Sequence, residues 1–86
     1  MTMEQIVINW IKSRIRSTNN FYSYEFEETI PVYGRLTSGK THTASSYSRA
    51  FRKLRQSNSL RNHGIQLTEI EHNTNGKVKG WRIETL

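Results

Sequence analysis

The sequence contains no cysteine and no aspartate, and it has a single proline. Without cysteine there can be no disulfide framework, no thiol nucleophile and no zinc site with thiolate ligands. The apolar core must therefore carry folding. All seven acidic residues are glutamate, because aspartate is absent.

Long apolar runs are also missing. The stretch 6–11 follows Glu4 rather than a basic segment, is too short to span a membrane, and has no small-residue cleavage site after it. We therefore expect no membrane partner and a soluble, intracellular protein, in the cytoplasm or on the nucleoid, or in the nucleus if the source is eukaryotic.

Length and charge set the class of protein. The 86 residues predict one domain, 1–86. Thirteen Lys and Arg against seven Glu give a net charge of +6, a balance that most often serves a polyanionic partner such as nucleic acid or an anionic membrane surface. A hydrophobic content of 34%, with the aromatics in patterned segments, argues against disorder.

The first helix is indicated by the Thr2-x-x-Gln5 spacing of a capping box. Apolar residues then recur at helical intervals over 3–15. We expect this helix to end near Ser17, with Asn19-Asn20 supplying a left-handed stop.

The next segment, 21–33, is ambiguous, since its apolar residues fit a period of two and nearly fit a helix. Ser23 could cap a short helix that Pro31 would stop at Ile30, and we favour this interpretation. The polar composition of 34–43 predicts a connector.

A third helix is expected after Thr41 or Thr43, either of which could cap it. One face of this helix is apolar: Ala44, Tyr47, Ala50, Phe51 and Leu54.

The C-terminal part, 65–83, is typical of a β-hairpin around 73–77. A two-residue turn at 75–76 would split the apolar residues between the two faces. A three-residue loop at 74–76 instead pairs Leu67 with Ile83, Ile65 with Thr85, and Glu71 with Lys79. We expect this second register because it gathers Ile65, Leu67, Trp81 and Ile83 on one face.

This order of elements resembles that of winged helix-turn-helix domains over nearly the whole chain. The resemblance rests on 45–55 as a recognition helix and on 65–70 and 78–83 as wing strands. It implies an α+β fold class, a winged helix of three helices with a C-terminal β-hairpin wing. It also implies that the last helix enters the DNA major groove while the wing touches backbone or minor groove. The connector 34–43 is longer than the tight turn usual in that family.

The outer face of the third helix carries the candidate base-reading residues. Arginine can bond guanine N7 and O6, and glutamine can read adenine, whereas the alternative is an ordinary solvated helix face. These residues are Ser45, Arg49, Arg52 and Gln56, flanked by Ser48 and Lys53.

Further cations could contact DNA phosphates. Those of the hairpin are Lys77, Lys79 and Arg82, although Glu69 and Glu71 on the partner strand would neutralise part of their charge, and tip lysines also serve solubility. Arg14, Arg16 and Arg35 could extend the footprint.

The segment 34–41 satisfies the G-x-x-x-x-G-K-T pattern of a nucleotide-binding loop. That chemistry needs an acidic residue, usually aspartate, to hold Mg²⁺, and a parallel sheet for which the remaining chain leaves no room. We therefore expect no nucleotide hydrolysis. The loop amides and Lys40 would instead suit a DNA phosphate.

No catalytic set stands out. His42, His63 and His72 have no mutual helical spacing and no acidic partner nearby, so we expect no metal, no cofactor and no enzymatic activity. The aromatics Tyr22, Tyr24, Phe26 and Trp81 are more often core than a stacking platform for single strands.

The sequence thus predicts a protein that binds double-stranded DNA, a small transcriptional or replication regulator. The competing class is a protein-interaction module, for instance a viral factor, that docks on a nucleic-acid-processing protein through Tyr47 or Trp81 if they are exposed. A homodimer would serve palindromic sites, and the first helix is the only plausible apolar seam.

Overall fold

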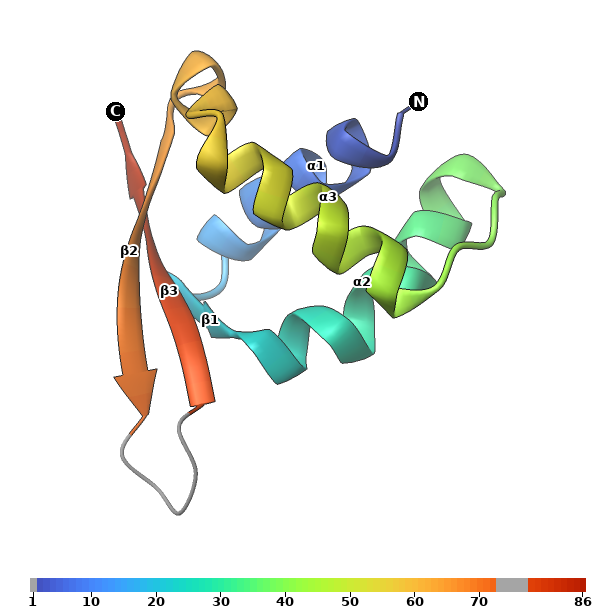
Figure 1. Ribbon diagram of the computed structural model, residues 1–86, viewed down its shortest axis with the longest axis horizontal. Helices are drawn as coiled ribbons and strands as arrows, with labels where there is room; N and C mark the ends of the chain where they lie inside the picture. Colours follow the sequence, from blue (N-terminus) through green and yellow to red (C-terminus); the bar gives the residue numbers. More distant parts are fainter. Residues whose placement is uncertain (1, 73–77) are drawn as a thin grey trace.

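The computed structural model describes residues 2–72 and 78–86, and it confirms the α+β class. Three helices lie to one side of a three-stranded antiparallel sheet whose order is β1-β3-β2 (Figure 1). The elements are α1 (Met3–Ile15), β1 (Asn20–Tyr22), α2 (Ser23–Ser38), α3 (Ala44–Gln56), a 3₁₀ turn η1 (Ser59–His63), β2 (Ile65–His72) and β3 (Val78–Thr85).

Helix α1 begins as predicted, with Thr2 as its N-cap: the Gln5 backbone N–H donates to Thr2 Oγ1 at 3.2 Å. The Gln5 side chain does not complete the box, because its Nε2 donates to Asn9 Oδ1 at 3.1 Å. The predicted left-handed stop at Asn19-Asn20 is wrong. The helix ends on a right-handed Arg16, and Asn20 opens β1, whose pairing with β3 holds it extended.

Strand β1 was missed in the sequence, and α2 is longer than predicted. Only Asn20–Tyr22 forms a strand, and α2 begins at Ser23. The alternation of apolar residues therefore reflects a strand only at the start of this segment, and the helical spacing describes the rest. Ser23 is the first helical residue rather than the cap. Pro31 lies inside the 16-residue helix, which changes direction about midway (Figure 1). Proline removes one N–H and bends a helix, and beyond it Gly34 on the buried face of α2 packs against Tyr47 of α3.

The connector to α3 is correspondingly short. Residues 34–38, predicted to be connector, form the end of α2, and only 39–43 link the helices. Gly39 closes α2 in the left-handed conformation, at φ 73°, which glycine adopts without steric cost. Of the two candidate caps, Thr43 is the one used: the Ser46 backbone N–H donates to its Oγ1 at 3.2 Å.

The predicted hairpin register is confirmed. Leu67 pairs with Ile83, Ile65 with Thr85, and Glu71 with Lys79. Ile65, Trp81 and Ile83 are buried and Leu67 packs partly buried against the same core. The expected loop at 74–76 lies outside the described residues.

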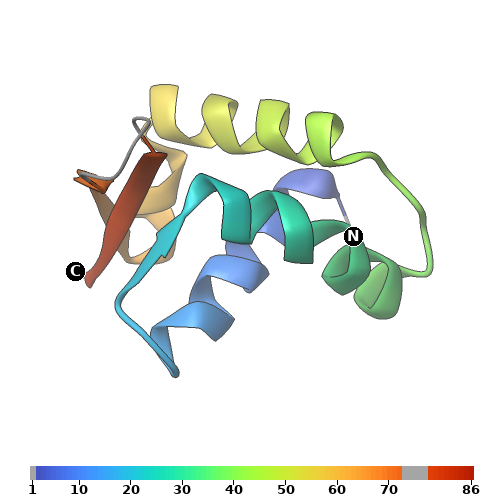
Figure 2. The same cartoon turned by 90° about the horizontal axis from the view of Figure 1, so that it is seen from below.

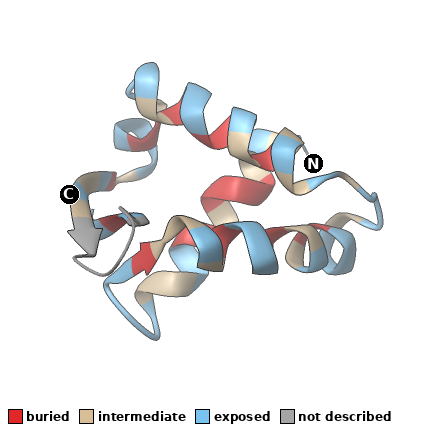
Figure 3. Cartoon of the chain, turned by 60° about the horizontal axis from the view of Figure 1, so that its bottom comes forward, coloured by how far each residue is buried: buried red, intermediate tan, exposed pale blue. Residues whose placement is uncertain are grey.

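The core lies between the helices and the inner face of the sheet. In Figure 3 the buried segments of α1 lie between α2 and α3. Aromatic rings join all the layers: Trp10 of α1 meets Phe21 edge-on at 4.9 Å between ring centroids, and Phe51 of α3 meets Trp81 of β3 edge-on at 4.9 Å. This packing fixes α3 against β3, and it buries Phe26 and Trp81 as expected for core residues.

Candidate nucleic-acid interface

Helix α3 has two chemically distinct faces. Tyr47, Ala50, Phe51 and Leu54 are buried against the core, as predicted. The opposite face carries Ser45, Ser48, Arg49, Arg52, Lys53 and Gln56, all exposed except the half-buried Ser48. We call these six residues the α3 stripe. The helix contains no acidic residue, so the stripe is uniformly basic or neutral along its length.

The stripe's cations are not used inside the molecule. Among the side chains that the structure describes there are three ion pairs: Arg14 with Glu25, Lys79 with Glu69, and Arg82 with Glu84. None of them involves α3. The three positive charges of the stripe are therefore available to a partner.

Two carboxylates border the stripe. Glu27 of α2 lines a hollow together with Ser45, Ser48, Arg49 and Arg52. On the other side, Glu4 near the start of α1 lines a hollow with Arg49, Arg52 and Lys53. Glu4 and Glu27 are both exposed, which leaves the charges between them largely screened by solvent.

A hollow of about 570 Å³ joins the α3 stripe to the hairpin. We call it the α3–β3 hollow. Its lining brings Arg52 and Gln56 of the stripe together with Lys79 of β3, and it also includes Ser23, Arg55 and Trp81. Figure 2 shows that α3 runs toward the sheet. The helix and the hairpin therefore both place a positively charged side chain, Arg52 and Lys79, at this hollow.

Arg55 also lines the α3–β3 hollow, but it was not among the DNA-binding residues predicted from the sequence. Its guanidinium carbon lies 4.5 Å from the ring centroid of Phe51 and 4.7 Å from that of Trp81, a geometry for cation–π contact with both. Desolvation lowers the pKa of Arg55 from its usual value, the charge of Arg52 lowers it further, and Glu69 opposes both. The signal in the sequence was Phe51 four residues earlier, which places Arg55 over an aromatic ring on the same side of the helix.

The remaining predicted cations are scattered. Lys40 is exposed in the connector at the N-terminal end of α3, and Lys79 is exposed at the hairpin and paired with Glu69 at 3.7 Å. Arg82 lies exposed and 3.9 Å from Glu84. Lys77 lies outside the described residues.

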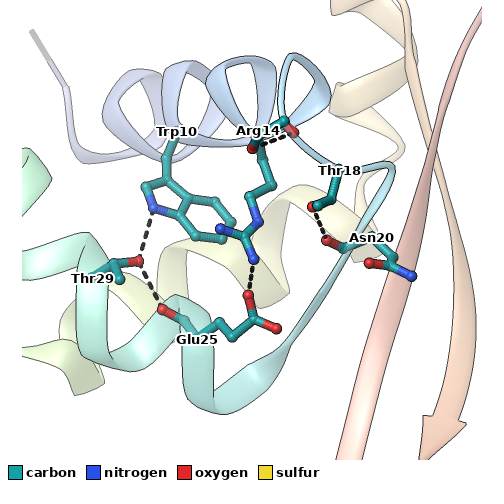
Figure 4. Close-up of polar contacts among 7 residues, drawn as sticks. Trp10, Arg14, Thr18, Asn20, Glu25 and Thr29 are labelled. Atoms are coloured by element: carbon teal, nitrogen blue, oxygen red, sulfur yellow. Dashed lines mark hydrogen bonds and ion pairs between the residues drawn. The ribbon is translucent and has the colours of Figure 1, made fainter.

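The footprint suggested for the first two helices changes. Arg14 is half-buried and bridges α1 to Glu25 of α2, a structural contact that takes it out of the phosphate-binding set (Figure 4). Arg16, just beyond α1, and Arg35, in the last turn of α2, are exposed, and neither lines the hollows around the stripe.

The segment that matches the nucleotide-binding pattern straddles a helix end. Gly34 to Ser38 are helical, whereas a phosphate-binding loop runs from a strand into a helix. The Gly39 N–H donates to Arg35 O at 2.9 Å and the Lys40 N–H to Ser38 Oγ at 3.3 Å. The amides of Gly39 and Lys40 are therefore already bonded within the chain, and a DNA phosphate contact at this segment stays a prediction for the other amides of the link and the Lys40 side chain.

Other predicted contacts are also corrected. Tyr47 is fully buried and Trp81 is 7% exposed, so neither can dock a protein partner. The apolar residues of α1 from Ile6 to Ile11 are buried in the core, which excludes this helix as a dimer seam. Tyr24, which was expected in the core, is 49% exposed, and its ring stacks on that of Tyr22 with 5.9 Å between the ring centroids.

Metal and membrane chemistry find no support in the described ranges. No cluster of three histidine, aspartate or glutamate side chains there could hold a metal ion. Nor does any helix among residues 2–72 and 78–86 combine the length and the apolar character needed to cross a membrane.

No protein-family model, curated protein or solved structure matches this chain. The candidate interface is thus defined by its own chemistry. It consists of a helix whose outer face carries three cations and no carboxylate, and of a hollow that joins this face to Lys79 of the hairpin.

Proposed function

We propose that this chain is a winged-helix protein that binds double-stranded DNA without catalysing a reaction, with α3 in the major groove and the β2–β3 hairpin against the backbone. The order of elements and the sheet order β1-β3-β2 support this layout. The short 39–43 link between α2 and α3 supports it as well, because it is close to the three- or four-residue turn of helix-turn-helix motifs.

The observation that carries the proposal is the α3–β3 hollow. A reading helix and a wing can engage one duplex only if their cations lie on the same side of the molecule. Arg52, Gln56 and Lys79 line that one depression. The α3 stripe and Lys79 of the hairpin therefore face one depression, so that a single polyanion such as DNA can contact both.

The dimensions fit a groove. Thirteen helical residues make α3 about 20 Å long, and an α-helix fits the major groove of B-DNA. Lys40 lies beyond the N-terminal end of α3 and Lys79 beside its C-terminal half, so lysines flank the reading face at both ends. Such lysines position the helix through phosphates, while Arg49, Arg52 and Gln56 carry groups that can bond base edges.

Regulation of transcription or replication is the role we expect from such binding, because a small non-catalytic protein that reads a duplex acts by occupying a site. We place Ser45, Ser48 and Lys53 with the stripe as neighbours of the reading residues. Arg55 has a different role in the proposed interface. Its guanidinium lies against both the Phe51 and the Trp81 rings and so joins α3 to the wing, and the charge it adds to the hollow favours a nearby phosphate.

The experiment is a titration of labelled duplex DNA with the protein by fluorescence anisotropy over a series of salt concentrations. We expect binding at low salt, with log K falling by about 0.9 per log unit of salt for each phosphate neutralised. Lys40→Ala, which removes an expected phosphate contact, should weaken binding and reduce this slope. Lys12→Ala, an exposed position of α1 outside the hollows around the stripe, removes the same charge and should change neither. Absence of duplex binding at low salt would overturn the proposal.

A further inference from the structure

A second surface lies on the outer side of α2. Val32 is 49% exposed and Leu36 is 78% exposed, and their spacing of four residues places them on one face of the helix. Beside them runs a groove of about 440 Å³ between α1 and α2. Its lining comes from both helices: Trp10, Ser13, Arg14, Ser17, Glu28, Thr29, Val32, Tyr33 and Leu36. We call it the α1–α2 groove.

The walls of this groove are held in place by specific contacts. Trp10 Nε1 donates to Thr29 Oγ1 at 3.0 Å, and that hydroxyl donates to the Glu25 carbonyl at 2.7 Å. The Arg14–Glu25 ion pair joins the same two helices nearby (Figure 4). The groove is therefore preformed, so an incoming side chain would not have to organise it.

Opposite charges flank Val32 along the helix. Glu28 precedes Val32 by four residues and Arg35 follows it by three, which corresponds to about 6 Å and about 4.5 Å along the axis. Both side chains are exposed, and neither belongs to an ion pair among the side chains that the structure describes. Glu28, Val32, Arg35 and Leu36 form a row along the outer face of α2, which we call the Val32 row. This row is acidic on one side of Val32 and basic on the other.

Such a row is complementary to itself. If a second copy packs its α2 antiparallel about a two-fold axis through Val32, Glu28 of each copy falls beside Arg35 of the other, and both Leu36 side chains find a groove. We propose that the outer face of α2 is a homodimer interface, with Glu28 and Arg35 forming two symmetric intermolecular ion pairs around Val32 and Leu36.

This interface leaves the α3 stripe free. The buried face of α2 includes Gly34, which lies against Tyr47 of α3, and the Val32 row lies on the opposite side of the helix. The α1–α2 groove and the hollows around the stripe share no lining residue of α3. The proposed dimer therefore does not use the α3 stripe, and its test contains no DNA.

The first measurement is sedimentation equilibrium of the full chain from about 10 μM to about 1 mM, a range that detects weak self-association. We expect a monomer–dimer equilibrium. Leu36→Ser should weaken it by about tenfold or more, since the side chain loses its burial in the partner's groove. Leu86→Ser, at a 62% exposed leucine outside this face, is the matched control and should leave it unchanged. A monomer throughout the range, or equal effects of the two variants, would overturn the proposal.

The second measurement is a charge exchange. Glu28→Arg and Arg35→Glu each place like charges opposite one another in a symmetric dimer, so each variant alone should associate more weakly than the original chain. An equimolar mixture of the two variants restores opposite charges at both contacts. It should therefore form a heterodimer. The two positions lie about 10 Å apart along one helix, too far for pairing within one copy, so a mixture no more associated than its components would rule out the proposed pairing. Circular dichroism of each variant checks that these exposed substitutions leave the fold intact.

Discussion

Gly34 of α2 lies directly against the phenol ring of Tyr47 in α3, with no space between them for a side chain. A Cβ atom at Gly34 would overlap the Tyr47 hydroxyl and lie 2.8 Å from its Cζ. Tyr47 is fully buried, and among the described residues its hydroxyl has no hydrogen-bond partner. This contact sets the spacing of α2 and α3, and through it the position of the α3 stripe.

Gly34→Ala is expected to destabilise the protein although alanine is the better helix former by about 1 kcal/mol. Overpacking of a buried contact costs about 1–3 kcal/mol, and the measured loss is the difference between these two effects. Urea denaturation followed by circular dichroism gives the free energy of unfolding. Tyr47→Phe in the same chain removes the overlapping hydroxyl and should recover part of the loss. If Gly34→Ala instead stabilises the chain by the full helix-propensity gain of about 1 kcal/mol, no overpacking occurs and the close approach of α2 and α3 is wrong.

The stability of the protein should fall at high pH because of Tyr47. Burial raises the pKa of this phenol above its usual value of 10.0. As pH rises past that value the unfolded chain loses the proton first, so the unfolded state gains stability between the usual and the raised pKa. The contribution of Tyr47 is therefore complete below pH 10 and is lost above it. Denaturation at a series of pH values should show a smaller decrease for Tyr47→Phe, which has no proton to lose.

Local sequence signals were sufficient where one physical cause dominated. Thr2 and Thr43 cap helices because their hydroxyls accept from backbone N–H groups three residues later. The hairpin register followed from placing the apolar residues on one face. Both features depend on neighbours in sequence or on a single pairing.

The errors arose where tertiary packing overrode a local rule. Pro31 ends helices by its own chemistry, yet packing of the surrounding turns carries α2 on to Ser38. A three-residue strand such as β1 has too little pattern to detect, and it exists because β3 offers it a partner.

The candidate interface was likewise predicted only in part from the sequence. The exposed stripe follows from helical periodicity, and it was predicted from the spacing of Ser45, Arg49, Arg52 and Gln56. The contact of Arg55 with Phe51 follows from their four-residue spacing, whereas its contact with Trp81 requires knowing that β3 packs against α3, which no local signal gives.

Arg55→Lys is expected to lower stability while keeping the charge. Lysine lacks the planar guanidinium that lies over Phe51 and Trp81, and the loss of such contacts costs about 0.5–1 kcal/mol. Arg52→Lys, at an exposed position of the same helix, makes the same chemical change without aromatic contacts and should leave the free energy of unfolding within about 0.5 kcal/mol. Equal stability losses in the two variants would show that the stacking contributes nothing.

The last prediction separates base reading from charge. If α3 enters the major groove, Arg49→Ala and Arg52→Ala should each cost about 1–3 kcal/mol on a preferred duplex, selected beforehand from a random pool, and should flatten the preference at the base pair they contact. Lys40→Ala and Lys79→Ala should instead weaken all duplexes alike and reduce the salt slope by about 0.9 each, because phosphates carry no sequence information. Competition titrations of preferred against random duplex measure both effects. Equal losses on the two duplexes for all four variants would mean that the α3 stripe supplies charge alone.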